Sequence, residues 1–223
     1  MSKFDGINRV IFDLDNTLIK HHFEREHVLI AKHIGLEGSA EFEKQLDDMF
    51  SNNLNYLKNI KVTKEYFCHV IEELMPILKK VGKTGEELLD IIDKYHSGTL
   101  MEGADELLEY LHESGYQIVA FTNWFGDYQF KILKKLGIDK YFERMYGWDN
   151  YYAKPHHQAM MRALGGTEPC KNVMIGDDVT GDIILPKSCG IKAIGFNVNY
   201  SGYKKDIKAD ADVTHLIDIK KYL

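Results

Sequence analysis

Two acidic residues stand close together in the turn that follows the first apolar run of the chain. Asp13 and Asp15 come directly after residues 10–12, and Thr17 follows two positions later. Alternate residues of an extended turn can project the same way, so one carboxylate could attack an electrophile while the other exchanges a proton with the leaving or attacking oxygen. The plainer alternative is a solvated turn rich in Asp.

Two polar clusters suited to phosphoryl oxygens follow later in the chain. Thr122 and Asn123 end the apolar run 118–121, where a hydroxyl and exposed backbone amides could hold such oxygens. Lys154 precedes Pro155, and proline suits the first turn of a helix, so we expect the ammonium at a helix start, where it could neutralise a phosphoryl group. Taken singly, these residues also fit a polar strand end and a solvated lysine.

A third cluster packs acidic residues into the loop 176–182, directly after the apolar run 173–175. Asp177, Asp178 and Asp182 would repel one another unless a cation lies among them. Oxygen ligands with retained waters are what magnesium prefers, and the metal would bridge the protein to a substrate phosphate. The loop lacks the twelve-residue ligand pattern of an EF-hand. The cluster therefore predicts a magnesium site.

The elements that must position these residues are short apolar runs separated by helical stretches. Continuous apolar runs without alternation, at residues 10–12, 118–121, 173–175 and 191–196, are typical of parallel strands buried on both faces. Strands alternating with helices predict an α/β fold with a Rossmann-like, doubly wound parallel sheet. Because proline is tolerated only in a first helical turn, Pro186 predicts that the helix after the acid cluster starts late, near Leu185.

Residues 19–100 break this rhythm and offer helix signals almost throughout. Ser39 and Thr63 precede helix-periodic apolar residues, and Thr84 with Glu87 has capping-box spacing. We expect about four helices here, forming a helical-bundle cap that stands over the strand ends, where open α/β sheets place their ligands. The predicted α/β core comprises residues 1–18 and 101–223.

Composition excludes several classes of function. The formal net charge of −6 argues against a surface that tracks nucleic-acid phosphates, and 44% hydrophobic residues can bury a sizeable core. The three cysteines are widely spaced without paired motifs, which fits reduced thiols. With neither an apolar signal segment at the N-terminus nor an apolar run long enough for a membrane span, we expect a cytoplasmic protein, monomeric or homodimeric, without membrane or nucleic-acid partners.

The four clusters, in this order and each at the end of a buried run, resemble the signature of the haloacid dehalogenase-like hydrolase superfamily. The resemblance covers nearly the whole chain. The long insertion after the first motif is similar to the branch with a helical cap, and about 30 residues between the second and third motifs leave no room for the alternative α/β cap. The matching residues, in motif order, are Asp13, Asp15 and Thr17; Thr122; Lys154; and Asp177 with Asp182.

The resemblance implies a role for each of these residues. Asp13 would attack phosphorus to give an aspartyl-phosphate, and Asp15 would protonate the leaving group and then activate water. Magnesium would be held by the Asp13 carboxylate, the Asp15 backbone carbonyl and Asp177, with Asp178 or Asp182 acting through water. The phosphoryl oxygens would be bound by Thr17, Thr122, the Asn123 amide and Lys154.

The predicted function is a magnesium-dependent phosphatase acting on a small phosphorylated metabolite, such as a sugar phosphate, nucleoside monophosphate or phosphoglycolate-like acid. A phosphomutase of the β-phosphoglucomutase kind would share every motif residue and stays open. Dehalogenation is disfavoured because the dehalogenating relatives lack an acid at the position of Asp15. A signalling receiver domain would place its acid cluster after the first strand and its phosphorylated Asp later, which is the reverse of the order here.

Two further features leave alternatives open. Relatives often continue the second motif as Thr-Asn-Gly, whereas here Trp124 follows Asn123, so Trp124 either faces the substrate or is a buried anchor between core and cap. His21 and His22 follow the first motif and are candidates for substrate contact, with hinge residues that bind no ligand as the alternative.

Overall fold

The computed structural model describes residues 3–57 and 59–223; residues 1, 2 and 58, which fall inside the ranges expected for core and cap, lie outside this description. The chain divides into two compact units. We call them the core unit, formed by Met1–Lys20, Thr99–Gly147 and Lys154–Leu223, and the helical unit, formed by His21–Gly98 and Trp148–Ala153.

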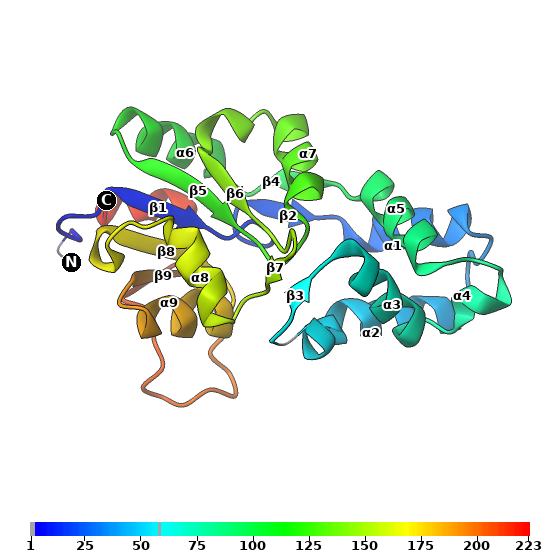
Figure 1. The fold of residues 1–223 in the computed structure, drawn as a ribbon. Coiled ribbons are helices and arrows are strands. Elements are labelled where there is room, and N and C mark those ends of the chain that lie inside the picture. Colours follow the sequence, from blue (N-terminus) through cyan, green and yellow to red (C-terminus); the bar gives the residue numbers. More distant parts are fainter. Residues whose placement is uncertain (1–2, 58) are drawn as a thin grey trace. The chain divides into compact units, whose positions relative to one another are not determined.

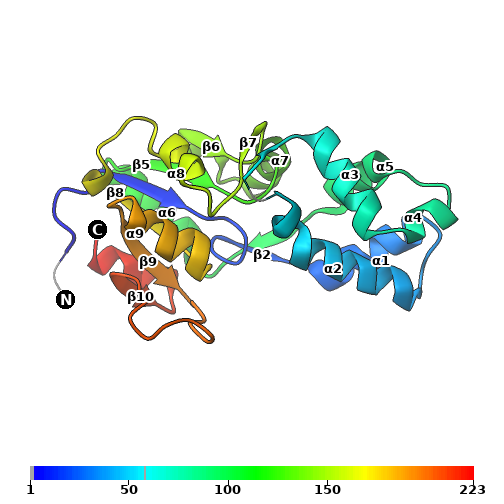
Figure 2. The ribbon, with the colours of Figure 1, turned by 60° about the horizontal axis from the view of Figure 1, so that its bottom comes forward.

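The core unit is built on a parallel sheet with the strand order β10-β9-β8-β1-β5-β6 (Figures 1 and 2). The middle strand β1 (Arg9–Phe12) lies between β5 (Gln117–Phe121) and β8 (Asn172–Gly176). Since these three strands end in register, residues that follow them meet at one edge of the sheet. The outer strands are β9 (Lys192–Phe196), β10 (Ala211–Val213) and β6 (Arg144–Tyr146). The predicted Rossmann-like fold class is confirmed.

Helices cover both faces of this sheet, which explains the continuous apolar runs. The helices α6 (Ala104–Glu113) and α7 (Gly126–Leu136) lie on one side, and α8 (His157–Leu164) and α9 (Leu185–Ser188) lie on the other (Figures 1 and 2). Short 3₁₀ segments span Asp139–Tyr141, Pro169–Lys171 and Leu216–Lys221. Right-handed crossovers require this division, because the chain reverses its direction across the sheet after β6.

A π-helix precedes α9 and accommodates a proline. The π-helix spans Val179–Ile184, and the α-helical turn begins at Leu185, so the prediction of a late start near Leu185 is confirmed. In an α-helix the ring of Pro186 would clash with the carbonyl four residues earlier, that of Asp182. The wider turn, in which the Leu185 N–H reaches the Thr180 carbonyl, relieves that clash.

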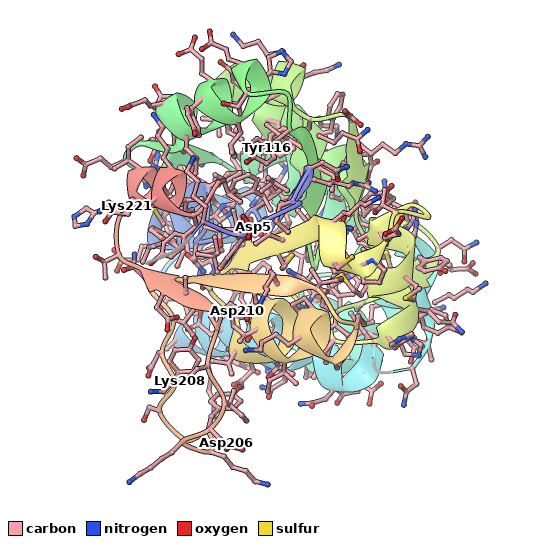
Figure 3. All side chains as sticks on the ribbon, turned by 90° about the vertical axis from the view of Figure 1, so that its left-hand side faces the viewer. Asp5, Tyr116, Asp206, Lys208, Asp210 and Lys221 are labelled. Carbon is pink, nitrogen blue, oxygen red and sulfur yellow. The ribbon has the colours of Figure 1, made fainter. Side chains whose placement is uncertain are left out.

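The connection from β9 to β10 projects from the core unit as a polar loop (Figure 3). Asp206 and Lys208 lie on its outer part, and Asp210 lies where it rejoins the sheet. The Asp210 carboxylate accepts hydrogen bonds from the Ala193 N–H at 2.9 Å and from Lys192 Nζ at 3.2 Å, which fix the return of the chain into β10.

The helical unit contains five helices among its described residues, one more than the four expected. They are α1 (Phe23–His33), α2 (Ala40–Leu57), α3 (Lys64–Leu74), α4 (Ile77–Lys80) and α5 (Gly85–Tyr95). The capping box of Thr84 and Glu87 is present at the start of α5, and the Thr63 side chain accepts the Tyr66 N–H at the start of α3. The additional helix, α4, is a single turn of four residues.

Residues 148–153 belong to the helical unit, whereas the sequence-based ranges place them in the core. The short strands β3 (Lys61–Val62) and β7 (Tyr151–Tyr152) pair antiparallel, and Trp148 is buried with its ring 5.1 Å from that of Phe67. Strand pairing and aromatic packing with segments far away in the sequence hold residues 148–153 in the helical unit.

The chain passes between the units within β2 (Ile19–His21) and β4 (Gly98–Leu100), which pair with each other, and again on either side of residues 148–153. Across the described residues, the helices are too short or too polar to span a membrane.

Candidate active site

Asp13 lies at the end of β1, at the edge where the central strands finish. Its N–H donates to the Ile175 carbonyl at 2.9 Å, which continues the β1–β8 pairing and fixes the backbone. Its carboxylate accepts hydrogen bonds from Lys154 Nζ at 2.6 Å and from Thr17 Oγ1 at 3.2 Å. Asp13 is only 6% exposed. A buried carboxylate with two donors is held in a single orientation, as a nucleophile requires.

Lys154 is buried and joins Asp13 to the acid cluster. Its ammonium donates to Asp13 and, at 2.8 Å, to Asp182. Burial disfavours the ammonium, but the two carboxylates hold the pKa of Lys154 above its usual range, so the side chain stays charged.

The Asn123 side chain positions the backbone of Lys154. Its Oδ1 accepts the Lys154 N–H at 2.8 Å, and its Nδ2 donates to the Lys154 carbonyl at 3.2 Å. The expectation that Pro155 starts a helix is wrong. Helix α8 begins at His157, and the ring of His156 provides the N-cap by accepting the Gln158 N–H at 3.1 Å. Lys154 therefore stands at the site because Asn123 binds its backbone on both sides.

Three carboxylates gather at the ends of β1 and β8. Oxygen atoms of Asp13, Asp177 and Asp182 lie within 4.8 Å of one another, and Asp182 is fully buried. Gly176 makes this arrangement possible, since a Cβ there would lie 2.2 Å from Asp182 Oδ2. The site thus brings together three of the five acids predicted to serve magnesium.

The other two acids use their side chains differently. The Asp178 N–H donates to Asp182 Oδ2 at 3.1 Å, while the Asp178 carboxylate accepts the Gly181 N–H and caps the π-helix. The Asp15 carboxylate accepts hydrogen bonds from Gln129 and, at 3.4 Å, from Thr122 Oγ1. For Asp15 the predicted ligand is in any case the backbone carbonyl, so a side chain engaged elsewhere does not conflict with it.

The three carboxylates of the cluster carry more negative charge than the neighbouring Lys154 offsets. Burial and the neighbouring Asp13 raise the pKa of Asp177 to about 7, although Lys154 lowers it. Burial likewise raises the pKa of Asp182 to about 8 and raises that of Asp13, in both cases against the opposing effect of Lys154. Since one ammonium does not offset three carboxylates, a bound divalent cation would stabilise their ionised forms.

Gln129, on α7, is a site residue that the sequence reasoning missed. It is fully buried, and its Nε2 lies 2.8 and 2.9 Å from the two carboxylate oxygens of Asp15. The apolar residues of this helix in the sequence include Phe130, Leu133 and Leu136, but Phe130 is 38% exposed. A signal was available, because Gln129 is a polar residue one turn before the buried Leu133.

Two further sequence candidates are Trp124 and His21. Trp124 is buried, with its ring 5.8 Å from that of Phe125 in an edge-to-face arrangement. His21 belongs to the helical unit, where its ring stacks on His96 at 4.6 Å and its Nδ1 lies 3.0 Å from the Ser97 carbonyl oxygen. The stacking and the backbone contact favour a structural role for His21.

Comparison with protein families gives a match over most of the chain. The model of the haloacid dehalogenase-like hydrolases matches residues 7–190. Among curated proteins, a phosphoglycolate phosphatase of Nitrosococcus oceani is 30% identical over 56% of this chain and 57% of its own length. The pyrophosphatase PpaX of Halalkalibacterium halodurans is 23% identical over 96% of this chain and 95% of its own. The pyrimidine 5'-nucleotidase PynA of Streptococcus pneumoniae is 26% identical over 86% of this chain and 84% of its own length.

Solved structures share the fold over nearly the full length. The hydrolase YfnB of Bacillus subtilis, described as bound to magnesium, superposes with a TM-score of 0.71 at 18% identity and covers 96% of both chains. A 2-haloacid dehalogenase of Pseudomonas syringae superposes with a TM-score of 0.67 at 18% identity, covering 96% of this chain and 97% of its own. A dehalogenase therefore shares this architecture, so the fold alone does not identify the reaction.

Proposed function

The chain belongs to the haloacid dehalogenase-like hydrolases, and from that premise we propose that it is a magnesium-dependent phosphatase of small phosphorylated metabolites. One observation carries the proposal. A buried carboxylate, Asp13, lies 2.6 Å from the Lys154 ammonium inside an acid cluster, while a second carboxylate, Asp15, accepts hydrogen bonds from Gln129 and Thr122. This pairing supplies a nucleophile and an independent proton carrier.

In the proposed reaction the Asp13 carboxylate oxygen attacks phosphorus in line as the bond to the leaving oxygen breaks. Asp15 gives its proton to that oxygen, which departs as an alcohol, and Asp13 carries the phosphoryl group. A water molecule then attacks phosphorus, Asp15 takes its proton, and the bond from Asp13 to phosphorus breaks to release inorganic phosphate.

The donors around Asp13 fit the charge of a phosphoryl group. Lys154, already charged and buried, would neutralise one equatorial oxygen, while the hydroxyls of Thr17 and Thr122 and the Asn123 backbone amide would donate to the others. In the structure the Thr17 hydroxyl donates to Asp13 and the Thr122 hydroxyl donates to Asp15, so both hydroxyls lie beside the reacting carboxylates.

The donor set also fits magnesium. We propose that the ion is held by the carboxylates of Asp13 and Asp177 and the backbone carbonyl of Asp15, with Asp182 contributing through water. When bound, magnesium supplies positive charge that offsets the negative charge on the phosphoryl oxygens. Asp178 would act on the site through the turn that it caps.

The substrate class follows from the relatives, whose names cover a phosphorylated hydroxy acid, pyrophosphate and pyrimidine nucleotides. We propose that the substrate is a small metabolite of one of these kinds that carries a terminal phosphate. The three cysteines are free thiols, which fits the reducing compartment expected from the sequence, and a cytoplasmic location stays a prediction.

The test is release of inorganic phosphate from phosphoglycolate, pyrophosphate, uridine and cytidine monophosphates and sugar phosphates, with magnesium and again with chelator. Magnesium-dependent release that Asp13→Asn abolishes would support the proposal. A 2-haloacid assayed for halide release provides the matched alternative, since the dehalogenase fold is shared. Halide release without phosphate release would contradict the proposal, and conversion of a sugar phosphate into its isomer would favour the mutase.

A further inference from the structure

An amide group that no motif includes donates to the carboxylate of Asp15. Gln129 Nε2 lies 2.8 Å from Asp15 Oδ1 and 2.9 Å from Oδ2, so it is shared between both oxygens. The third described contact, from Thr122 Oγ1, is longer at 3.4 Å. Gln129 is fully buried on α7, one turn before the core residue Leu133, so the packed helix holds the amide in place.

The orientation of the Gln129 amide is determined by its partner. A carboxylate only accepts hydrogen bonds, so the NH₂ end must face Asp15 and the carbonyl end must point away. That carbonyl oxygen, Oε1, is buried and has no hydrogen-bond partner among the described residues. An unsatisfied buried carbonyl destabilises the fold. The Gln129 carbonyl therefore costs stability, while the NH₂ group of the same amide contacts Asp15.

A neutral amide suits a group that must alternate between two protonation states. An arginine or lysine beside Asp15 would favour the ionised carboxylate alone. The amide can donate to whichever oxygen lacks the proton, so its hydrogen bond persists when Asp15 carries a proton and when it does not.

We propose that Gln129 is a positioning residue that holds the Asp15 carboxylate in the orientation from which it protonates the leaving oxygen and later accepts a proton from water. This inference rests on the proposed function. Gln129 acts on the reaction through Asp15, which its amide group contacts.

The test compares Gln129→Met with Leu133→Met. The first substitution keeps the length of the side chain and removes the amide. The second places the same residue at a buried position one turn further along α7, without contact to Asp15 among the described interactions. The two substrates are phenyl phosphate and p-nitrophenyl phosphate, which have nearly the same shape. The nitrophenolate leaves without a proton, whereas the more basic phenolate needs one.

For Gln129→Met we expect kcat/KM on phenyl phosphate to fall by about 10–100-fold, and kcat/KM on p-nitrophenyl phosphate to fall far less. On the second substrate kcat should fall, with a burst of nitrophenolate, because water attack on the phosphorylated Asp13 becomes slow. Leu133→Met should behave as wild type on both substrates.

Equal losses on both substrates, no loss on phenyl phosphate, or an equal effect of Leu133→Met would overturn the inference. If Gln129→Met does not fold, Gln129→Leu takes its place, and failure of both to fold would make the role purely structural and overturn it as well. A wild-type protein that releases phosphate from neither substrate nor from any compound of the metabolite panel would instead overturn the proposed function, and this inference with it.

Discussion

Replacing Lys154 by methionine tests how far the buried charges of the site depend on one another. The substitution keeps a chain of similar length and removes the ammonium that lies 2.6 Å from Asp13 and 2.8 Å from Asp182. Both carboxylates stay buried without that counter-charge. Breaking a buried ion pair in this way costs about 3–5 kcal/mol, which corresponds to a drop of roughly 6–20 °C in the melting temperature of a chain of this size.

The cost should depend on pH in a definite direction. The raised pKa of Lys154 keeps the ammonium charged throughout the neutral range, so the lysine itself adds no pH dependence there. The pKa values of Asp13 and Asp182 are already raised by burial and should rise further without the ammonium. A carboxyl group whose pKa is higher in the folded than in the unfolded state lowers the stability of the protein as pH rises through the folded-state pKa, because the folded state then has to hold the charged form. The difference between variant and wild type should therefore be larger at pH 8 than at pH 5.

The assay is thermal and denaturant unfolding of metal-free protein at both pH values, alongside phosphate release. Lys192→Met is the matched control, because Lys192 forms its ion pair with Asp210 at 3.2 Å on the surface, with half of its side chain exposed. That pair should contribute little. If Lys154→Met costs no more stability than Lys192→Met, or costs more at pH 5 than at pH 8, the reasoning about buried charge is refuted.

Three further predictions concern the same site. Asp13→Asn should lower kcat by at least about 10³-fold while circular dichroism stays unchanged, and substantial turnover would remove Asp13 from the nucleophile role. Because the pKa of Asp177 is raised to about 7, protons should compete with magnesium below that pH, weakening apparent affinity by up to about tenfold per unit, as titration calorimetry can measure. Without metal, the same shift should lower stability as pH rises from about 4 to 7. Gly176→Ala should cost about 1–3 kcal/mol by displacing the Asp182 side chain, and unchanged unfolding would show that the strand end relaxes freely.

Much of the fold and the order of the site were determined by the sequence itself. Apolar runs without alternation indicated strands buried on both faces, and acids and hydroxyls directly after them indicated a site at one edge of the sheet. Asp13, Asp177 and Asp182 meet there because their strands are parallel and in register. Pro186 likewise predicted the start of α9, because the position of a proline within a helix is limited by local backbone sterics alone.

Contacts between distant segments were decided only by the tertiary structure. Pairing of β3 with β7 places residues 148–153 in the helical unit, and neither two-residue strand has a pattern that a sequence can reveal. Lys154 is positioned by Asn123, 31 residues earlier, rather than by a helix start. Gln129 contacts Asp15 across 114 residues of chain. Sequence periodicity reports which face of an element is buried, but a hydrogen bond between two buried side chains depends on how the elements pack in three dimensions.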